Sequence, residues 1–373
     1  MKYLTAMLAA AVASAVAVSS MMEHRSLRYS KAGKTSKSSK RSGGSYSYNY
    51  SLDSMNIGDV PIDSINAPPQ EQQEIQSTFP HQVIGITSKE TLDDPSSPQA
   101  RALHWIMNDD GMTLDIDSPE WTQRYIMASF YFATGGGDWD ECNAPKDNSQ
   151  SAIDEANENC TLSATQYNIG KKRVYGTKPW LSPVSVCEWA STACHDTNNS
   201  KKGTISQIEF EDNGLEGILI DELSHLYNLQ FLILEKGKLS GNIPSQLGQL
   251  PLIILDLDYN QLSGEIPEEI YDATTLQQID LNNNQLGGII SLKITQLSTL
   301  TFFQIDNNMM EGSIPEEMGD MKNLAVFTLS NNNFTGKMPS EVCDNIKSNG
   351  QGGRLKLSLQ TANKLSALAV QNA

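Results

Sequence analysis

The chain has 373 residues and a formal net charge of −17, from 44 acidic and 27 basic side chains. The charge is uneven, because residues 1–41 hold eight Lys and Arg but only one acid, Glu23. Residues 42–373 therefore carry 19 basic and 43 acidic side chains. A body this acidic argues against a nucleic-acid-binding protein, since phosphate recognition needs basic patches.

The first 20 residues have the pattern of a signal peptide. Lys2 precedes a short apolar stretch rich in Ala and Val, and small residues follow it. The stretch is shorter and less apolar than a membrane span of ~20 residues requires, and no other segment approaches that length. We therefore expect a secreted or cell-surface protein without a membrane span, with an uncleaved signal anchor as the alternative.

Residues 21–96 are predicted to be disordered, first as a Lys/Ser/Gly-rich segment and then as a linker. Such a composition holds too few apolar side chains to form a core. Within it, four lysines recur at every third residue: Lys31, Lys34, Lys37 and Lys40. One interpretation is a solvated basic linker. The lysine spacing and SSKRSGGSYSYN (38–49) also resemble the silaffins, silica-forming proteins of diatoms, and this resemblance implies contact with silica or another polyanion.

Residues 97–203 are predicted to form a helical N-terminal cap. Ser97-Pro98 and Ser118-Pro119 each place an N-cap residue before a proline at the first helical position. The second helix should run to the glycines at 135–137. Its apolar stripe has helical spacing and should cover the open end of the domain that follows: Trp121, Tyr125, Ala128 and Phe132.

Residues 204–343 contain six copies of the pattern L-x-x-L-x-L-x-x-N-x-L-x-G-x-I-P, best seen in LIILDLDYNQLSGEIPEEI (252–270). The reference Asn positions recur after 23 or 24 residues, and Gly replaces Asn once: Asn213, Gly237, Asn260, Asn284, Asn308 and Asn332. This period and pattern predict an α/β solenoid of leucine-rich repeats with a parallel sheet on its concave face. We expect the Asn amides to bond backbone groups at the turn. Slightly looser packing, with the fold unchanged, is expected where the copies depart from this pattern: Gly237 in place of Asn, and Ile220 and Ser291 in place of the turn Pro.

The turn sequence S-G-x-I-P resembles plant-type leucine-rich repeats, which occur in receptor ectodomains and secreted wall proteins. CEWASTAC (187–194) resembles the end of the N-terminal cap of such proteins, which implies a Cys187–Cys194 disulfide. Cys142–Cys160 is then the simplest second bridge. The run QRYIMASFYFATGGGDWDEC (123–142) and WLS (180–182) resemble the caps of secreted diatom leucine-rich repeat proteins.

Residues 344–373 are expected to be a degenerate C-terminal cap and tail, with a final strand in RLKLSLQTANK (354–364). A cap at this end usually closes with a second cysteine, and none follows Cys343. Cys343 is therefore predicted to be a free or an intermolecular thiol.

Side chains that alternate with the inward leucines should line the concave face. Seven are carboxylates, and Tyr259 flanks them: Glu209, Glu211, Glu235, Asp256, Asp258, Asp280 and Asp306. Like charges on strands ~4.8 Å apart repel one another. One interpretation is that the acids keep a secreted protein soluble. The other is that they bind a lysine-rich peptide, a polyamine or Ca²⁺, and the chain's own lysine segment is a candidate in cis or in trans. Apolar residues on the same face offer anchors for a peptide instead: Phe231, Ile254 and Phe302.

No catalytic motif stands out. The five His residues lie near neither a G-x-S-x-G turn nor a metal-ligand spacing. Carboxylates on a solvent-facing sheet are expected to lack the burial that would make one a general acid. We therefore predict no enzyme, metal or cofactor. Sequons mark candidate glycosylation sites at Asn159, Asn198 and Asn333.

The leading functional prediction is non-catalytic recognition of an extracellular protein, peptide or glycan. A structural protein of a silica wall and an inhibitor of a secreted hydrolase are the alternatives.

Overall fold

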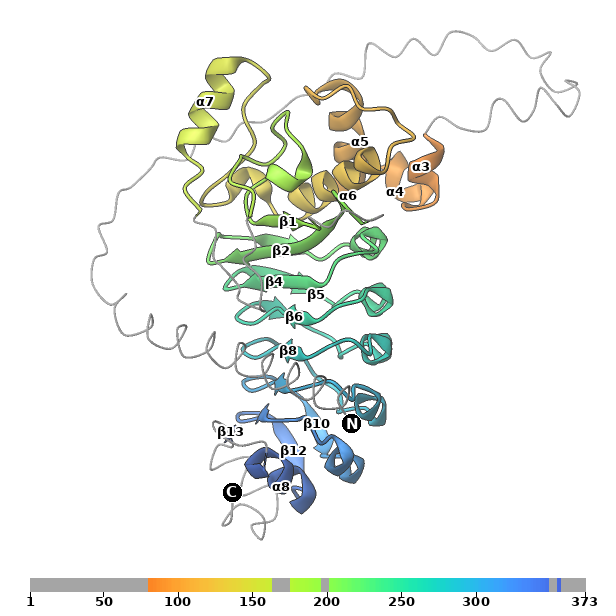
Figure 1. Ribbon diagram of the computed structural model, residues 1–373, viewed down its shortest axis with the longest axis vertical. Helices are drawn as coiled ribbons and strands as arrows, with labels where there is room; N and C mark the ends of the chain where they lie inside the picture. Colours follow the sequence, from red (N-terminus) through yellow and green to blue (C-terminus); the bar gives the residue numbers. More distant parts are fainter. Residues whose placement is uncertain (1–79, 163–174, 196–200, 349–353, 357–373) are drawn as a thin grey trace, which may run out of the picture.

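The computed structural model describes residues 80–162, 175–195, 201–348 and 354–356. The predicted signal peptide, the lysines at 31, 34, 37 and 40, and Asn198 lie outside the described residues. Figure 1 shows an elongated stack, with the N-terminal helices at one end, successive repeats below them and helix α8, Ser340–Ser348, at the other end. Within the described ranges, no helix combines the length and the apolar character that a bilayer span requires.

An eight-stranded sheet runs the length of the stack in the order β1-β2-β4-β6-β8-β9-β11-β13 (Figure 1). Every neighbouring pair is parallel except β1 and β2. The strands are β1 Thr192–Cys194, β2 Ile205–Glu211, β4 Phe231–Glu235, β6 Ile254–Asp256, β8 Gln278–Asp280, β9 Phe302–Gln304, β11 Val326–Thr328 and β13 Arg354–Lys356. Six successive parallel strands, β2 to β11, confirm the six-repeat solenoid. β13 falls at the start of the predicted final strand.

Within the described residues, the return paths of the repeats carry five short strands and five 3₁₀ helices; the fourth repeat has a 3₁₀ helix without a short strand, and in the sixth repeat helix α8 takes the place of the 3₁₀ helix. The short strands form two small parallel sheets: β3 Glu216–Ile218, β5 Lys238–Gly241 and β7 Gln261–Leu262 in one, β10 Glu311–Ser313 and β12 Asn333–Thr335 in the other. The 3₁₀ helices stack along the opposite side of the solenoid (Figure 1): η4 Asp221–His225, η5 Ser245–Gln249, η6 Glu268–Asp272, η7 Leu292–Gln296 and η8 Glu316–Asp320.

The core of the solenoid is a ladder of apolar side chains that occupy the same register on adjacent strands. All six are fully buried: Ile208, Leu232, Leu255, Ile279, Phe303 and Phe327. They belong to one hydrophobic cluster that extends from the cap to α8. No repeat has a core of its own, so stability depends on stacking.

The reference Asn amides bond backbone groups, as predicted, and these hydrogen bonds also join neighbouring repeats. The Asn284 amide donates to the carbonyls of Leu257 and Leu281 at 2.9 and 3.2 Å, and its oxygen accepts the Leu262 N–H at 2.9 Å. Asn260, Asn308 and Asn332 repeat this arrangement. In every repeat the preceding residue has a left-handed φ, which Asn and Gly adopt most readily: Asp212, Lys236, Tyr259, Asn283, Asn307 and Asn331.

The expectation of looser packing at Gly237 is wrong. A Cβ at this position would lie 2.8 Å from the Asn260 side-chain oxygen and 2.9 Å from the Leu215 carbonyl. The backbone of the second repeat therefore approaches the adjacent repeats closely, and glycine is what permits that approach.

The N-terminal cap contains the two predicted helices, α5 Pro98–Asn108 and α6 Pro119–Ala133, with Ser97 and Ser118 as N-caps. Order begins earlier than the sequence predicted, because α3 His81–Ile84 and α4 Lys89–Asp93 lie within the expected linker. Each of these two helices is four or five residues long and buries one apolar side chain, so neither shows a helical period. The cap is completed by η2 Gly136–Asp138, η3 Val186–Glu188 and α7 Gln150–Glu158.

Helix α6 lies across the open end of the solenoid (Figure 1), as the sequence predicted. Trp139 and Trp180 of the cap pack on Phe210 of the first repeat, with ring centroids 4.9 and 5.6 Å away. Glu222 of the first repeat accepts hydrogen bonds of 2.9 Å from Thr87 and Gln99 of the cap. The cap therefore continues the core and also pairs a buried carboxylate of the first repeat.

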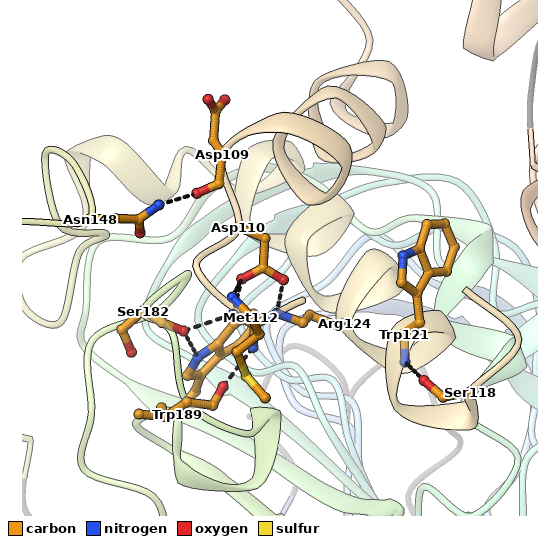
Figure 2. Close-up of polar contacts among 10 residues, drawn as sticks. Asp109, Asp110, Met112, Ser118, Trp121, Arg124, Asn148, Ser182 and Trp189 are labelled. Atoms are coloured by element: carbon orange, nitrogen blue, oxygen red, sulfur yellow. Dashed lines mark hydrogen bonds and ion pairs between the residues drawn. The ribbon is translucent and has the colours of Figure 1, made fainter. Parts of the chain in front are cut away.

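A buried ion pair organises the cap (Figure 2). Arg124 donates to Asp110 at 2.6 Å and to the Ser182 carbonyl at 2.8 Å, and both charged side chains are fully buried. Its guanidinium also lies 5.0 and 4.7 Å from the ring centroids of Trp105 and Trp189. Asp110 lies between α5 and α6, and its ion pair with Arg124 holds this connection in place.

Both predicted disulfides, Cys142–Cys160 and Cys187–Cys194, are present. Cys343 is a buried free thiol in α8 Ser340–Ser348, a helix that the sequence did not predict. Burial raises the pKa of this thiol. Cys343 forms no disulfide within the described part of this chain, and a disulfide to a second chain stays a prediction.

Candidate functional site: the concave face

The outward side chains of strands β2 to β11, with the residues that directly follow these strands, form the concave face. Strand pairing places six of them in one continuous row, in the order expected from the sequence: Glu209, Ile233, Asp256, Asp280, Gln304 and Thr328. In the next row, Glu211 lies opposite Glu235. The equivalent positions of the later repeats follow two residues after the first row: Asp258, Asn282, Asp306 and Ser330.

Three of the carboxylates converge. Glu235, Asp256 and Asp258 each offer an oxygen, and the three oxygens lie within 4.8 Å of one another. This spacing suits a shared positive charge, either a divalent cation or an ammonium group that donates to several oxygens. The second and third repeats therefore hold the densest negative charge on the face.

Amide and hydroxyl groups on the following strand donate hydrogen bonds to carboxylates of this face. Gln278 donates to Asp256 at 3.2 Å, Gln304 donates to Asp280, and Thr328 donates to Asp306. At the first repeat, Lys236 donates to Glu211 at 2.6 Å. Gln304 and Thr328 were not among the side chains that the sequence singled out on this face. Their place one strand along from an acid is the signal that could have identified them as hydrogen-bond donors.

The expectation that these acids face solvent is wrong for most of them. Asp256 is 1% exposed, Asp280 4% and Glu235 5%, whereas the Glu211 side chain is 37% exposed. Neighbours on strands ~4.8 Å apart flank each carboxylate and contribute to this burial. Burial, with the charges of Asp256 and Asp258, raises the pKa of Asp280 well above its ordinary value. Most of these carboxylates are therefore buried, contrary to the expectation from the sequence.

A third row, nearer the start of each strand, is largely apolar: Gln207, Phe231, Ile254, Gln278, Phe302 and Val326. Phe231, Ile233 and Ile254 pack into one buried cluster, and Phe302 and Val326 form a second. Tyr259, 44% exposed, directly follows Asp258 at the other side of the acidic rows. An apolar strip and an acidic strip thus run side by side along the solenoid.

Two predicted glycosylation sites can be placed. Asn159 is exposed at the C-terminal end of α7, and Asn333 is exposed in β12, outside the concave face. Both positions are compatible with a glycan that leaves the concave face clear. Modification of either residue stays a prediction.

The fold and this face define the class: a leucine-rich repeat solenoid with a disulfide-bonded N-terminal cap and a charged concave face. The Leucine Rich Repeat family model matches residues 251–273, 275–297 and 323–345. The repeats are of the plant receptor-kinase ectodomain type.

Two curated plant proteins illustrate this likeness. Leucine-rich repeat receptor protein kinase MSL1 of Oryza sativa subsp. japonica is 37% identical over 79 residues, which is 21% of this chain and 6% of that protein. The leucine-rich repeat receptor-like serine/threonine-protein kinase RGI4 of Arabidopsis thaliana is 33% identical over 109 residues, 29% of this chain and 9% of that protein. The chain therefore spans less than a tenth of either relative.

Among solved structures, the Arabidopsis thaliana BIR3–SERK2 complex contains a similar chain. It is 31% identical, with a TM-score of 0.37, and the match covers 42% of this chain and 81% of that one.

Proposed function

We propose that this protein is a non-catalytic recognition protein of the extracellular space, and that its concave face binds a basic peptide or a basic segment of a protein. The observation that supports this most is the acidic strip directly beside an apolar strip. A peptide with Lys or Arg beside apolar residues offers the complementary pattern. Seven carboxylates on one face favour such a ligand over a neutral glycan, because charge complementarity governs encounter and specificity.

The test is binding of Lys- and Arg-containing peptides from a random library, measured by fluorescence anisotropy. Asp256→Asn with Asp258→Asn removes two charges at the convergence point and should weaken binding at least tenfold. The matched control is Glu316→Gln with Glu317→Gln, which removes the same charge from exposed positions on η8. If both double variants bind equally well, the concave face is not the binding site.

A silica-associated wall protein is the second proposal, and the periodic lysines at 31–40 favour it. In an organism that makes silica, cell walls would be washed with hot detergent and then dissolved in ammonium fluoride. Release of the protein only on dissolution of the silica would support this role and the resemblance to diatom proteins. Recovery in medium or detergent would contradict it. Tight binding of a secreted hydrolase would instead favour the inhibitor alternative.

A further inference from the structure

We propose that the protein's own lysine segment, Lys31 to Lys40, occupies the concave face in cis and competes there with external ligands. This inference rests on the proposed function, since it assigns an internal competitor to the same face. It is carried by charge, by matched spacing, by the length of the connecting chain and by buried acceptors on the face.

The spacing of the lysines matches the spacing of the strands. In a polyproline II conformation, which Lys/Ser/Gly-rich chains readily adopt, three residues complete a turn and advance about 9 Å. The four lysines then project from one side of the segment at intervals of about 9 Å. Two strand intervals measure about 9.6 Å. A segment that crosses the strands can therefore place one ammonium group over every second repeat.

The acids lie where such a segment needs them. Three consecutive lysines of the four, placed over the first, third and fifth repeats, would meet Glu209 or Glu211, then Asp256 and Asp258, then Asp306. The same positive charges would offset the repulsion from Asp256 and Asp258, which adds to burial in raising the pKa of Asp280. A flexible segment that carries only one lysine would gain one of these contacts and not the series.

The connecting chain is long enough. Lys40 precedes Pro80, the first described residue, by 40 residues. With the flexibility that its composition predicts, a chain of that length would have a root-mean-square span of about 35 Å, and such a tether would give a local concentration on the order of 1 mM. The N-terminal cap, where the described chain begins, adjoins the first repeat. Docking in cis therefore requires no unusual geometry.

Two buried polar atoms on the face point to a donor ligand. Gln207 is fully buried, and its amide nitrogen donates to Glu209 at 2.8 Å and to the Tyr175 hydroxyl at 2.5 Å. Its carbonyl oxygen has no hydrogen-bond partner among the residues that the structure describes. The hydroxyl oxygen of Ser330, 4% exposed at the other end of the face, is in the same state within the described ranges. An ammonium group donates three hydrogen bonds and suits such acceptors.

The first experiment is zero-length carbodiimide cross-linking of the full chain at micromolar concentration, followed by peptide mass spectrometry. We expect amide links from Lys31–Lys40 to acids between 209 and 306. In a mixed sample of ¹⁴N- and ¹⁵N-labelled chains, links between unlike chains at the frequency of random pairing would overturn occupancy in cis. Links only to exposed acids elsewhere, such as Glu316, would overturn docking on this face.

The second experiment measures competition. A labelled peptide of residues 28–44 is titrated into the wild-type chain and into the full chain with K31Q, K34Q, K37Q and K40Q. The variant should bind the peptide at least tenfold more tightly, because its own segment no longer competes. Addition of D256N and D258N to the variant should abolish the gain, whereas E316Q and E317Q should not.

The outcomes separate the two proposals. Equal affinity of the wild type and the four-lysine variant would overturn the internal competitor and leave the proposed function standing. Absence of binding of any basic peptide to either protein, with native circular dichroism, would overturn both. Calcium binding that D256N and D258N abolish, without peptide binding, would identify the face as a metal site and overturn the proposal.

Discussion

Replacement of Asn284 by Ala tests whether the Asn ladder stabilises the solenoid. The Asn ladder is the series of reference Asn residues that hydrogen-bond from one repeat to the next: Asn260, Asn284, Asn308 and Asn332. The Asn284 side chain is 9% exposed and makes four hydrogen bonds: one accepted from Leu262 N–H, and three donated to the carbonyls of Leu257, Leu281 and Asn282. Alanine leaves the buried Leu262 N–H without this acceptor, at a cost of about 1–3 kcal/mol. The lost donor costs less, because the Leu257 and Leu281 carbonyls also accept from Asn260 and Asn308.

We expect the free energy of unfolding to fall by about 3 kcal/mol in total. This total combines the cost of leaving the Leu262 N–H without an acceptor with about 0.5–1.5 kcal/mol for each of the bonds lost. Urea denaturation followed by far-UV circular dichroism measures this, provided that the m-value does not change. Gln285→Ala is the matched control, since Gln285 is exposed in the next position and should change stability by less than about 0.5 kcal/mol.

Asn284→Asp sharpens the test. The carboxylate keeps an acceptor for Leu262 N–H but faces the carbonyl oxygens of Leu257 and Leu281 without a proton to donate. Asp should therefore be worse than Ala at pH 7 and should recover as it is protonated at acidic pH. If N284A lost no more stability than Q285A, the ladder would not be the device that joins the repeats.

Three further outcomes are expected. Because the pKa of Asp280 is raised in the folded state, the folded chain holds a proton that the unfolded chain has lost. Stability should therefore rise as pH falls from neutrality toward the ordinary value of 3.8, by up to about 1.4 kcal/mol per pH unit, and Asp280→Asn should flatten this dependence in pH-resolved urea titrations. Arg124→Ala should lower the free energy of unfolding by about 3–5 kcal/mol, because it leaves the Asp110 charge buried without its partner. Tryptophan fluorescence should then show an earlier unfolding transition. The double variant Arg124→Ala/Asp110→Ala should be less destabilised than the sum of the two single variants. Native Cys343 should resist iodoacetamide until denaturant is added, and rapid labelling of the native protein would contradict its burial.

The repeated framework could be predicted from the sequence because every repeat solves the same physical problem in the same way. Inward leucines follow the period of two that a strand imposes, and the reference Asn follows the period of the solenoid. Residues 252–270 alone contain both signals. The Cys187–Cys194 pair followed from a resemblance of the cap, Cys142–Cys160 was then the simplest second bridge, and both were confirmed.

Features that occur once in the chain were harder to predict. Asp110 and Arg124 are 14 residues apart, and nothing in the spacing shows that their side chains meet in a buried site. Helices α3 and α4 are too short to show a period. The period of two also predicts toward which side of the sheet Asp256 points, but not how deeply it is buried.

The repeated framework and the concave face are nevertheless linked, because the stacking of the strands also sets the distance between carboxylates on neighbouring repeats. With strands ~4.8 Å apart, the ligand pattern depends on which repeats carry an acid. The first five do, whereas the sixth presents Thr328 and Ser330. Substitutions in the sixth repeat that keep the Thr328 hydrogen bond to Asp306, such as Ser at that position, should leave the affinity for a basic peptide unchanged. Asp306→Asn should weaken binding and reduce its salt dependence, because it removes the last negative charge of the series.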